Sequence, residues 1–185
     1  TADCAPTTCP RLNMALASNG GSVQAELGAP AESIDGTLVG NSNGWSYDGS
    51  ASADDVKVAV YTLGTRTIVD QVNVISGIGR DDHMVAGMRL LYTSDAMVSA
   101  GGSQWLAVRN VVPLDPVAGL AGFGNEINAS TTLDGQHYVR LGFEPVNATG
   151  LKIEVFDTNA GDDDVMLTEF MAIGYPLACG AVNRP

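Results

Sequence analysis

The chain has 185 residues, 45% of them hydrophobic, and nine basic residues stand against 21 acidic ones, giving a formal charge of −12. A chain of this length buries one full core, so we expect a single domain over residues 1–185. The charge argues against a nucleic-acid partner, which requires a basic footprint, and no apolar run reaches the ~18 residues of a membrane span, so no membrane insertion is expected.

Segments typical of β-strands follow one another along most of the chain. Turn-forming groups separate them, namely LGT, GIG, SAGG, LDG, VNATG and TNAGDDD. Near the N-terminus, SVQAELGAP fits either a short helix or an early strand. Many short strands with little 3.6-residue periodicity predict an all-β fold, a β-sandwich or jelly roll. The expected strands are VKVAVYT (56–62), TRTIVDQVNVIS (65–76), MRLLYTS (88–94), SQWLAVRNVV (103–112), HYVRLGFEPV (137–146), GLKIEVFDT (150–158) and VMLTEFMAIGY (165–175).

The three cysteines lie at the two ends of the chain, Cys4 and Cys9 at one end and Cys179 at the other. No CxxC pair or Cys/His cluster favours a zinc site. A bridge from Cys179 to Cys4 or Cys9 would close a long loop and, in the chain-entropy model, stabilise the folded state by about 4–5 kcal/mol. The alternative is three reduced thiols in a cytosolic protein. The disulfide interpretation favours an exported protein, extracellular or periplasmic. TADCAPTTCP lacks the basic and apolar regions of a signal peptide, so we expect any signal to be already removed.

Six segments, in order, resemble the galactose-binding-like fold of discoidin and coagulation-factor C domains and of related bacterial carbohydrate-binding modules. Together they run over nearly the whole chain. The resemblance implies a single galactose-binding-like β-sandwich and matches a terminal disulfide between Cys179 and Cys4 or Cys9. The segments are NMALASNGGS (13–22), SIDGTLVGNSNGW (33–45), QVNVISGIGRDD (71–82), MRLLYTSD (88–95), YVRLGFEPVNATGLKIEVF (138–156) and LTEFMAIGY (167–175).

The resemblance also implies a structural calcium ion at the IDG turn. Calcium takes six to eight oxygen ligands, many of them backbone carbonyls. Carried over to this chain, the ligands are Asp35, the Thr37 carbonyl, Ser42 and Glu169. The alternative is a plain β-turn with Glu169 exposed on an edge strand.

A second acidic segment, DTNAGDDDVMLTE (157–169), nearly matches an EF-hand loop. Asp162 occupies the position that requires glycine, and the closing Glu169 comes one residue too late. We therefore interpret Asp162–Asp164 as a solvated hairpin tip, with ion binding as the alternative.

The segment GIGRDDH (77–83) gathers an arginine, two aspartates and one of the two histidines between two apolar segments. If 71–76 and 88–94 are neighbouring strands, Arg80, Asp81, Asp82 and His83 occupy the tip of the connecting loop. Such side chains donate to and accept from adjacent sugar hydroxyls, and sugar-binding members of the family use loops at one end of the sandwich. The alternative is an Arg80–Asp82 ion pair that only ties the loop.

Three aromatic residues are candidates for stacking on a sugar ring. Phe123 lies in the long glycine-rich segment PLDPVAGLAGFGNEINAS, where it is either a stacking surface or an anchor of the loop. Trp45 and Trp105 stand where the family has buried aromatics, beside strand patterns, so we expect both in the core.

No GxSxG elbow, HExxH, P-loop or dinucleotide fingerprint is found. The segment GQHYVR contains the candidate catalytic residues Gln136, His137, Tyr138 and Arg140. Strand alternation divides them between two faces, which argues against a lyase groove. These absences argue against catalysis, and the resemblance implies a non-catalytic carbohydrate-binding module with a structural calcium, a monomeric part of a larger secreted protein that binds a polysaccharide or glycan. The alternatives are a cell-surface adhesion or assembly domain of the same fold and a small polysaccharide lyase or hydrolase.

Overall fold

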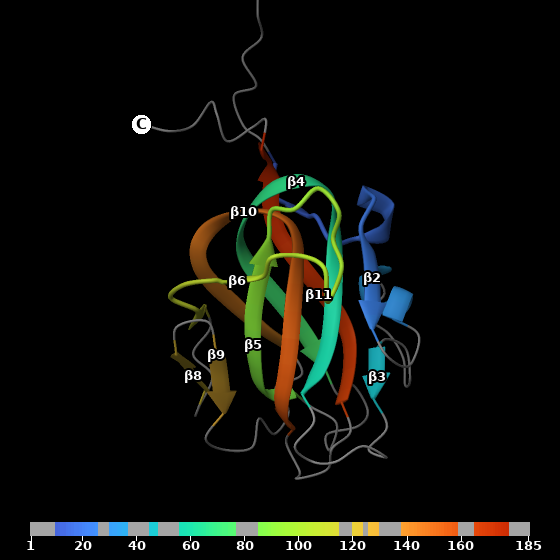
Figure 1. Cartoon of the computed structure of the whole chain (residues 1–185). Coiled ribbons are helices and arrows are strands. Elements are labelled where there is room, and N and C mark those ends of the chain that lie inside the picture. The colour runs from blue at the N-terminus through green and yellow to red at the C-terminus, as the bar shows by residue number, and fades with distance from the viewer. Residues whose placement is uncertain are drawn as a thin grey trace, which may run out of the picture.

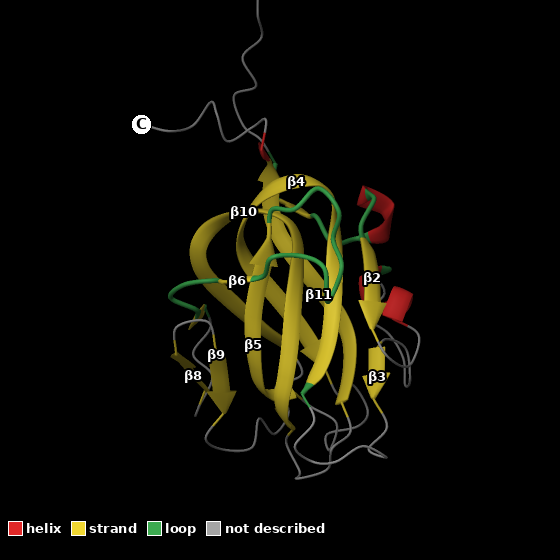
Figure 2. Cartoon of the chain, viewed as in Figure 1, coloured by secondary structure: helices red, strands yellow, loops and turns green. Residues whose placement is uncertain are grey.

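β-Strands dominate the part of the chain that the structure, a computed structural model, describes (Figure 2). That part comprises residues 10–25, 30–36, 45–47, 56–76, 85–114, 120–123, 126–129, 138–158 and 165–177. No helix in it is long and apolar enough to cross a membrane. The elements are β1 (Leu12–Asn13), η1 (Ala17–Asn19), β2 (Ser22–Ala25), η2 (Pro30–Ile34), β3 (Trp45–Tyr47), β4 (Lys57–Ser76), β5 (Val85–Thr93), β6 (Leu106–Ala107), β7 (Val112–Pro113), β8 (Leu120–Phe123), β9 (Glu126–Ala129), β10 (Tyr138–Thr158) and β11 (Val165–Pro176), of which η1 and η2 are 3-10 helices.

Two long strands, β4 and β10, each bend at the upper end of the molecule in Figure 1. Each joins two strands that the sequence predicts as separate, so the expected breaks at LGT and VNATG are bends and not strand ends. In β4 the bend passes so close to η1 that a Cβ on Gly64 would lie 1.8 Å from the Asn19 carbonyl oxygen. In β10 the register shifts between Gly142 and Val146 and between Ala148 and Gly150, as β-bulges do where a strand bends.

The bends fold one antiparallel sheet of 11 strands into two layers. Seven strands follow the order β1-β11-β4-β10-β5-β9-β8, and the other four pair beside this path: β2 with β4, β3 with β11, β6 with β5 and β7 with β10. In the front layer, residues 57–62 of β4 pair with residues 150–155 of β10, beside β2 and β5. In the back layer, residues 67–75 of β4 pair with residues 138–148 of β10, beside β11. The Tyr61 ring of the front layer stacks on Phe170 of the back layer, with centroids 4.0 Å apart. The layers thus enclose one core, which confirms the predicted all-β sandwich.

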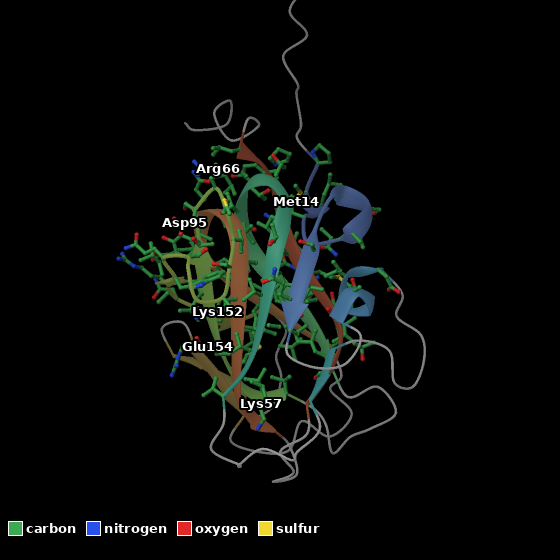
Figure 3. All side chains as sticks on the ribbon, turned by 45° about the vertical axis from the view of Figure 1, so that its right-hand side comes forward. Met14, Lys57, Arg66, Asp95, Lys152 and Glu154 are labelled. Carbon is green, nitrogen blue, oxygen red and sulfur yellow. The ribbon has the colours of Figure 1, made fainter. Side chains whose placement is uncertain are left out.

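The core follows the alternation read from the sequence. In β10, Leu151, Ile153 and Val155 are fully buried, whereas Lys152 and Glu154 point away from the core (Figure 3). Burying such an aliphatic side chain contributes about 1.5–3 kcal/mol. The largest fully buried side chains are Tyr61, Phe170, Met88, Leu90, Leu141, Leu151, Ile153, Leu167, Glu169 and Val60.

Several local expectations need correction. β4 and β5 are not neighbours, because β10 lies between them. The expected strand at 103–112 is reduced to β6, which pairs with β5, and β7, which pairs with β10. The segment from Leu106 to Pro113 therefore crosses from the front layer to the back layer at one edge of the sandwich, and we call it the edge strap. In SVQAELGAP, the strand interpretation is confirmed for Ser22–Ala25.

Candidate functional site

Glu169 is a carboxylic acid buried inside the sandwich. It lies in β11 with no exposed surface, and its Oε2 accepts a hydrogen bond from the Gly36 backbone N–H at 3.3 Å. Its Oε1 is buried and accepts no hydrogen bond from any described residue. Burial raises the pKa of Glu169 to about 7, opposed by the hydrogen bond from Gly36 and reinforced by the charge of Asp35. An unsatisfied buried carboxylate oxygen is costly and requires an explanation.

The Asp-Gly turn lies against Glu169, although Gly36 and Glu169 are 133 residues apart in sequence. Ser33 and Ile34, at the end of η2, are buried and fix this helix against the core. Gly36 has a φ of 81°, a left-handed conformation that glycine adopts without strain. Asp35 is exposed, and its charge acts on Glu169. The alternative of an exposed Glu169 on an edge strand is wrong, since β11 lies between β1 and β4 and the side chain is buried.

The donors at this turn suit a hard cation. Two carboxylates and the backbone of a glycine turn offer oxygen ligands, which calcium prefers. The described residues hold no cluster of three or more His, Cys, Asp or Glu side chains, so a cation here would need carbonyls and neighbouring residues as further ligands. Thr37 and Ser42, the other expected ligands, lie outside the described residues. The orphaned Oε1 of Glu169 is the observation that fits a bound ion.

The segment that contains Arg80, Asp81, Asp82 and His83 lies outside the described residues, but its two ends are placed. β4 ends at Ser76 and β5 begins at Val85, both at the lower end of the sandwich in Figure 1. The Val85 backbone N–H donates to the Ser76 hydroxyl at 3.3 Å in a buried hydrogen bond. The connection therefore leaves and re-enters the sandwich at one point, even though β4 and β5 are not paired.

The glycine-rich segment around Phe123 is not a structureless loop. β8 and β9 form an antiparallel hairpin, and β9 pairs with β5 at the edge of the sheet. Phe123 ends β8, and its side chain lies outside the described part. The sequence pattern missed the hairpin because its strands are only four residues long each. Cys4, Cys9, Cys179 and Asp162–Asp164 also lie outside the described residues.

Trp105 is not in the core, contrary to expectation. It is half-buried, and its indole N–H donates to the carbonyls of Ser99 and Ala100 at 3.2 and 3.1 Å. Lys152, on the outer face of β10, holds its Nζ 5.3 Å from the ring centroid. Trp105 thus fastens the preceding loop over the outer face of the front layer. For Trp45 the structure describes only the backbone, in β3.

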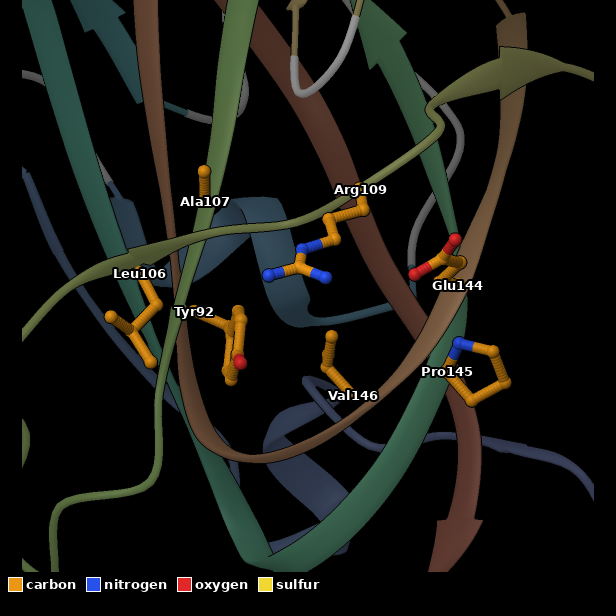
Figure 4. Close-up of a pocket in the computed structure, with 7 residues that line it drawn as sticks. All are labelled: Tyr92, Leu106, Ala107, Arg109, Glu144, Pro145 and Val146. Carbon is orange, nitrogen blue, oxygen red and sulfur yellow. The ribbon is translucent and has the colours of Figure 1, made fainter.

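A pocket of about 510 Å³ opens between the edge strap and the bend of β10 (Figure 4). No pattern in the sequence predicted this pocket, because its residues are far apart in the chain and lie in ordinary strand patterns. Volumes of this size hold small ligands. The lining residues are Tyr92, Leu106, Ala107, Arg109, Glu144, Pro145 and Val146.

No family model and no curated protein sequence matches the chain. Its fold, however, is that of the galactose-binding-like β-sandwich, as in family 32 carbohydrate-binding modules.

One such structure is the module CBM32-5 of CpGH89 from Clostridium perfringens, in complex with GalNAc-β-1,3-galactose. It has a TM-score of 0.57 and 13% identity, over 89% of this chain and 99% of that chain. CBM32-3 of a family 31 glycoside hydrolase from the same organism has a TM-score of 0.57 and 14% identity, over 90% and 94% of the two chains. A pectin-binding module has a TM-score of 0.51 and 15% identity, over 82% and 88%. At these identities the likeness shows the fold.

Proposed function

We propose that the chain is a non-catalytic carbohydrate-binding module of a secreted protein, found outside the cell or in the periplasm. The observation that carries this proposal is the fold likeness along almost the full length of both chains to a module that holds GalNAc-β-1,3-galactose. Fold alone does not determine function, so the ligand and its site require a separate argument.

The glycan site in this proposal is the lower end of the sandwich, where the segment between β4 and β5 leaves the scaffold. Ser76 and Val85, joined by a buried hydrogen bond, give this segment a rigid base. A guanidinium, two carboxylates and an imidazole at Arg80–His83 supply both donors and acceptors for hydroxyl groups. Phe123 would supply an apolar face, in keeping with the stacking of aromatic rings on apolar surfaces.

The second part of the proposal is a structural calcium ion held by Asp35, the Thr37 carbonyl, Ser42 and Glu169. Calcium at this turn would give the orphaned Oε1 of Glu169 a partner and neutralise a buried negative charge. The ion would join the turn after η2 to β11, which come from opposite ends of the sequence. Its role is therefore to stabilise the scaffold that carries the binding loops.

A glycan array probed with and without calcium tests this proposal. We expect binding to a subset of glycans, without release of product, and weaker binding in Arg80→Ala and His83→Ala variants. Binding to a protein partner without competition by sugar would favour an adhesion domain. Release of unsaturated oligosaccharides would show a lyase. Either result would overturn the proposed function.

A further inference from the structure

The pocket beside the edge strap lies apart from the loop end and from the Asp35–Glu169 turn. The lining that the structure describes comes from three places: Tyr92 near the end of β5, Leu106 to Arg109 of the edge strap, and Glu144 to Val146 in the bend of β10. The bend of β10 is at the upper end of the sandwich, whereas β4 ends and β5 begins at the lower end. A ligand in this pocket would therefore occupy a separate site.

Three polar groups around this pocket have hydrogen-bonding capacity to spare. The guanidinium of Arg109 points into the space between Tyr92 and Glu144 (Figure 4) and makes no hydrogen bond or ion pair with any described residue. One carboxylate oxygen of Glu144 accepts from the Asn110 side-chain amide, which leaves its second oxygen free among the described contacts. The Tyr92 hydroxyl likewise has no partner in the described part of the chain.

The edge strap is fixed in place on both sides of Arg109. Val108 and Val111 are buried in the core, and the Val108 N–H donates to the Leu90 carbonyl at 3.3 Å. The Glu144 N–H donates to the Arg109 carbonyl at 3.0 Å, so the two charged residues are joined through their backbones. A site whose backbone is already ordered loses little conformational entropy on binding.

This combination of groups suits a sugar ring. A pyranose has an apolar C–H face and hydroxyls that both donate and accept. Tyr92, Leu106 and Val146 provide aromatic and aliphatic surface, Arg109 donates in a fork that spans neighbouring hydroxyl oxygens, and Glu144 accepts. The Glu144 carboxylate and the formal charge of −12 both disfavour an anionic ligand.

We propose that this pocket binds one neutral hexopyranose unit of a glycan, as a second sugar site on the module. The proposal shares only its ligand class with the proposed function, because it does not depend on the loop end. Two sites on one module would let a single polysaccharide chain, or two neighbouring chains, be held with higher avidity than either site gives.

The test is a titration of the isotope-labelled full chain with galactose, glucose and mannose, followed by backbone amide NMR shifts. Galacturonic acid serves as the anionic counterpart of galactose. We expect at least one neutral hexose, at up to about 50 mM, to shift the amides of Tyr92, the edge strap and the β10 bend. Arg109→Ala should weaken this binding about tenfold or more, because charged hydrogen bonds are lost, and should leave shifts at residues 80–83 unchanged.

Arg89→Ala is the matched control, because Arg89 is three residues from Tyr92 in β5 but on the opposite face, in a partly buried ion pair with Glu154. It should leave the binding constant at the pocket unchanged. Absence of pocket shifts with all three hexoses overturns the proposal, as do equal shifts in Arg109→Ala or a response to galacturonic acid alone. If the pocket is silent while residues 80–83 respond, only this proposal fails. If the pocket responds while residues 80–83 do not, the assignment of the loop end fails and the pocket stands.

Discussion

In the absence of calcium, the Glu169→Gln variant should be more stable than wild type. In the presence of calcium, it should be less stable than wild type. The pKa of Glu169 is about 7 in the folded state against an ordinary 4.5, mainly because of burial. The folded state therefore binds the proton more tightly than the unfolded state, and stability falls as pH rises from about 4.5 to about 7. At 1.36 kcal/mol per pH unit, the loss reaches about 3 kcal/mol above pH 7.

Glutamine keeps the shape of the side chain and removes the charge. At pH 8 in EDTA, Glu169→Gln should gain up to about 3 kcal/mol, which corresponds to about 6–12 °C in Tm for a domain of this size. At pH 4 the gain should vanish, because Glu169 is then protonated in both states. With calcium at about 1,000 times its Kd, wild type gains about 4 kcal/mol, and the variant gains little because it has lost a charged ligand.

Thermal melts at pH 4 and pH 8, with EDTA or with calcium, measure these changes. The exposed Glu144→Gln substitution is the matched control and should alter stability by less than about 0.5 kcal/mol in each condition. If Glu169→Gln is less stable than wild type at pH 8 in EDTA, the carboxylate is not a destabilising buried charge. If calcium raises the Tm of both proteins equally, Glu169 does not hold the ion.

Three further predictions concern the loop end, the termini and the bend of β4. Alanine at each of Asp81, Asp82 and His83 should weaken glycan affinity by about 2–10-fold with unchanged Tm, as for hydrogen bonds in an open site. If calorimetry shows that all three variants bind as tightly as wild type, the site lies elsewhere. Mass spectrometry of the non-reduced protein should show Cys179 linked to an N-terminal cysteine, and a free Cys179 thiol would refute that pairing. Gly64→Ala should lower the free energy of unfolding by more than about 2 kcal/mol in chemical denaturation, because its methyl group would meet backbone. The control Gly101→Ala, with no atom within 4 Å of an added Cβ, should lower it by less than about 0.5 kcal/mol. Equal losses in the two variants would contradict the close packing at the bend.

Strand patterns located most of the sheet, because alternation in segments such as 150–158 reports directly which side chains face the core. They did not reveal that β4 and β10 continue through their turn-forming residues, since glycine and asparagine signal a change of direction whether or not the pairing ends. The neighbour of β5 was also missed. Strand pairing depends on contacts distant in sequence, and in this fold the strand β10 enters between β4 and β5, which precede it.

The pairing of Asp35 with Glu169 came from the resemblance to the family and not from a local pattern. The structure brings the Asp-Gly turn into hydrogen-bond contact with Glu169 through Gly36, and the calcium ion stays a prediction. The burial of Glu169 was not predictable, because a single acid in an alternating strand is usually on the solvent side. The pocket at Arg109 and Glu144 was not foreseen at all, since it exists only where the edge strap crosses between the layers. The half-exposed position of Trp105 depends likewise on a loop folding over Lys152.

The continuity of β4 and β10 through both layers has a mechanical consequence. In a sandwich whose layers are joined only by loops, the layers can slide or hinge against each other. Here β4 and β10, which pair with each other along most of their length, each pass as one continuous strand from one layer into the other. Any shear between the layers would have to unpair residues on both sides of the bends at once. The sandwich therefore resists deformation as one body, and the lower end keeps a fixed geometry when the upper end is pulled.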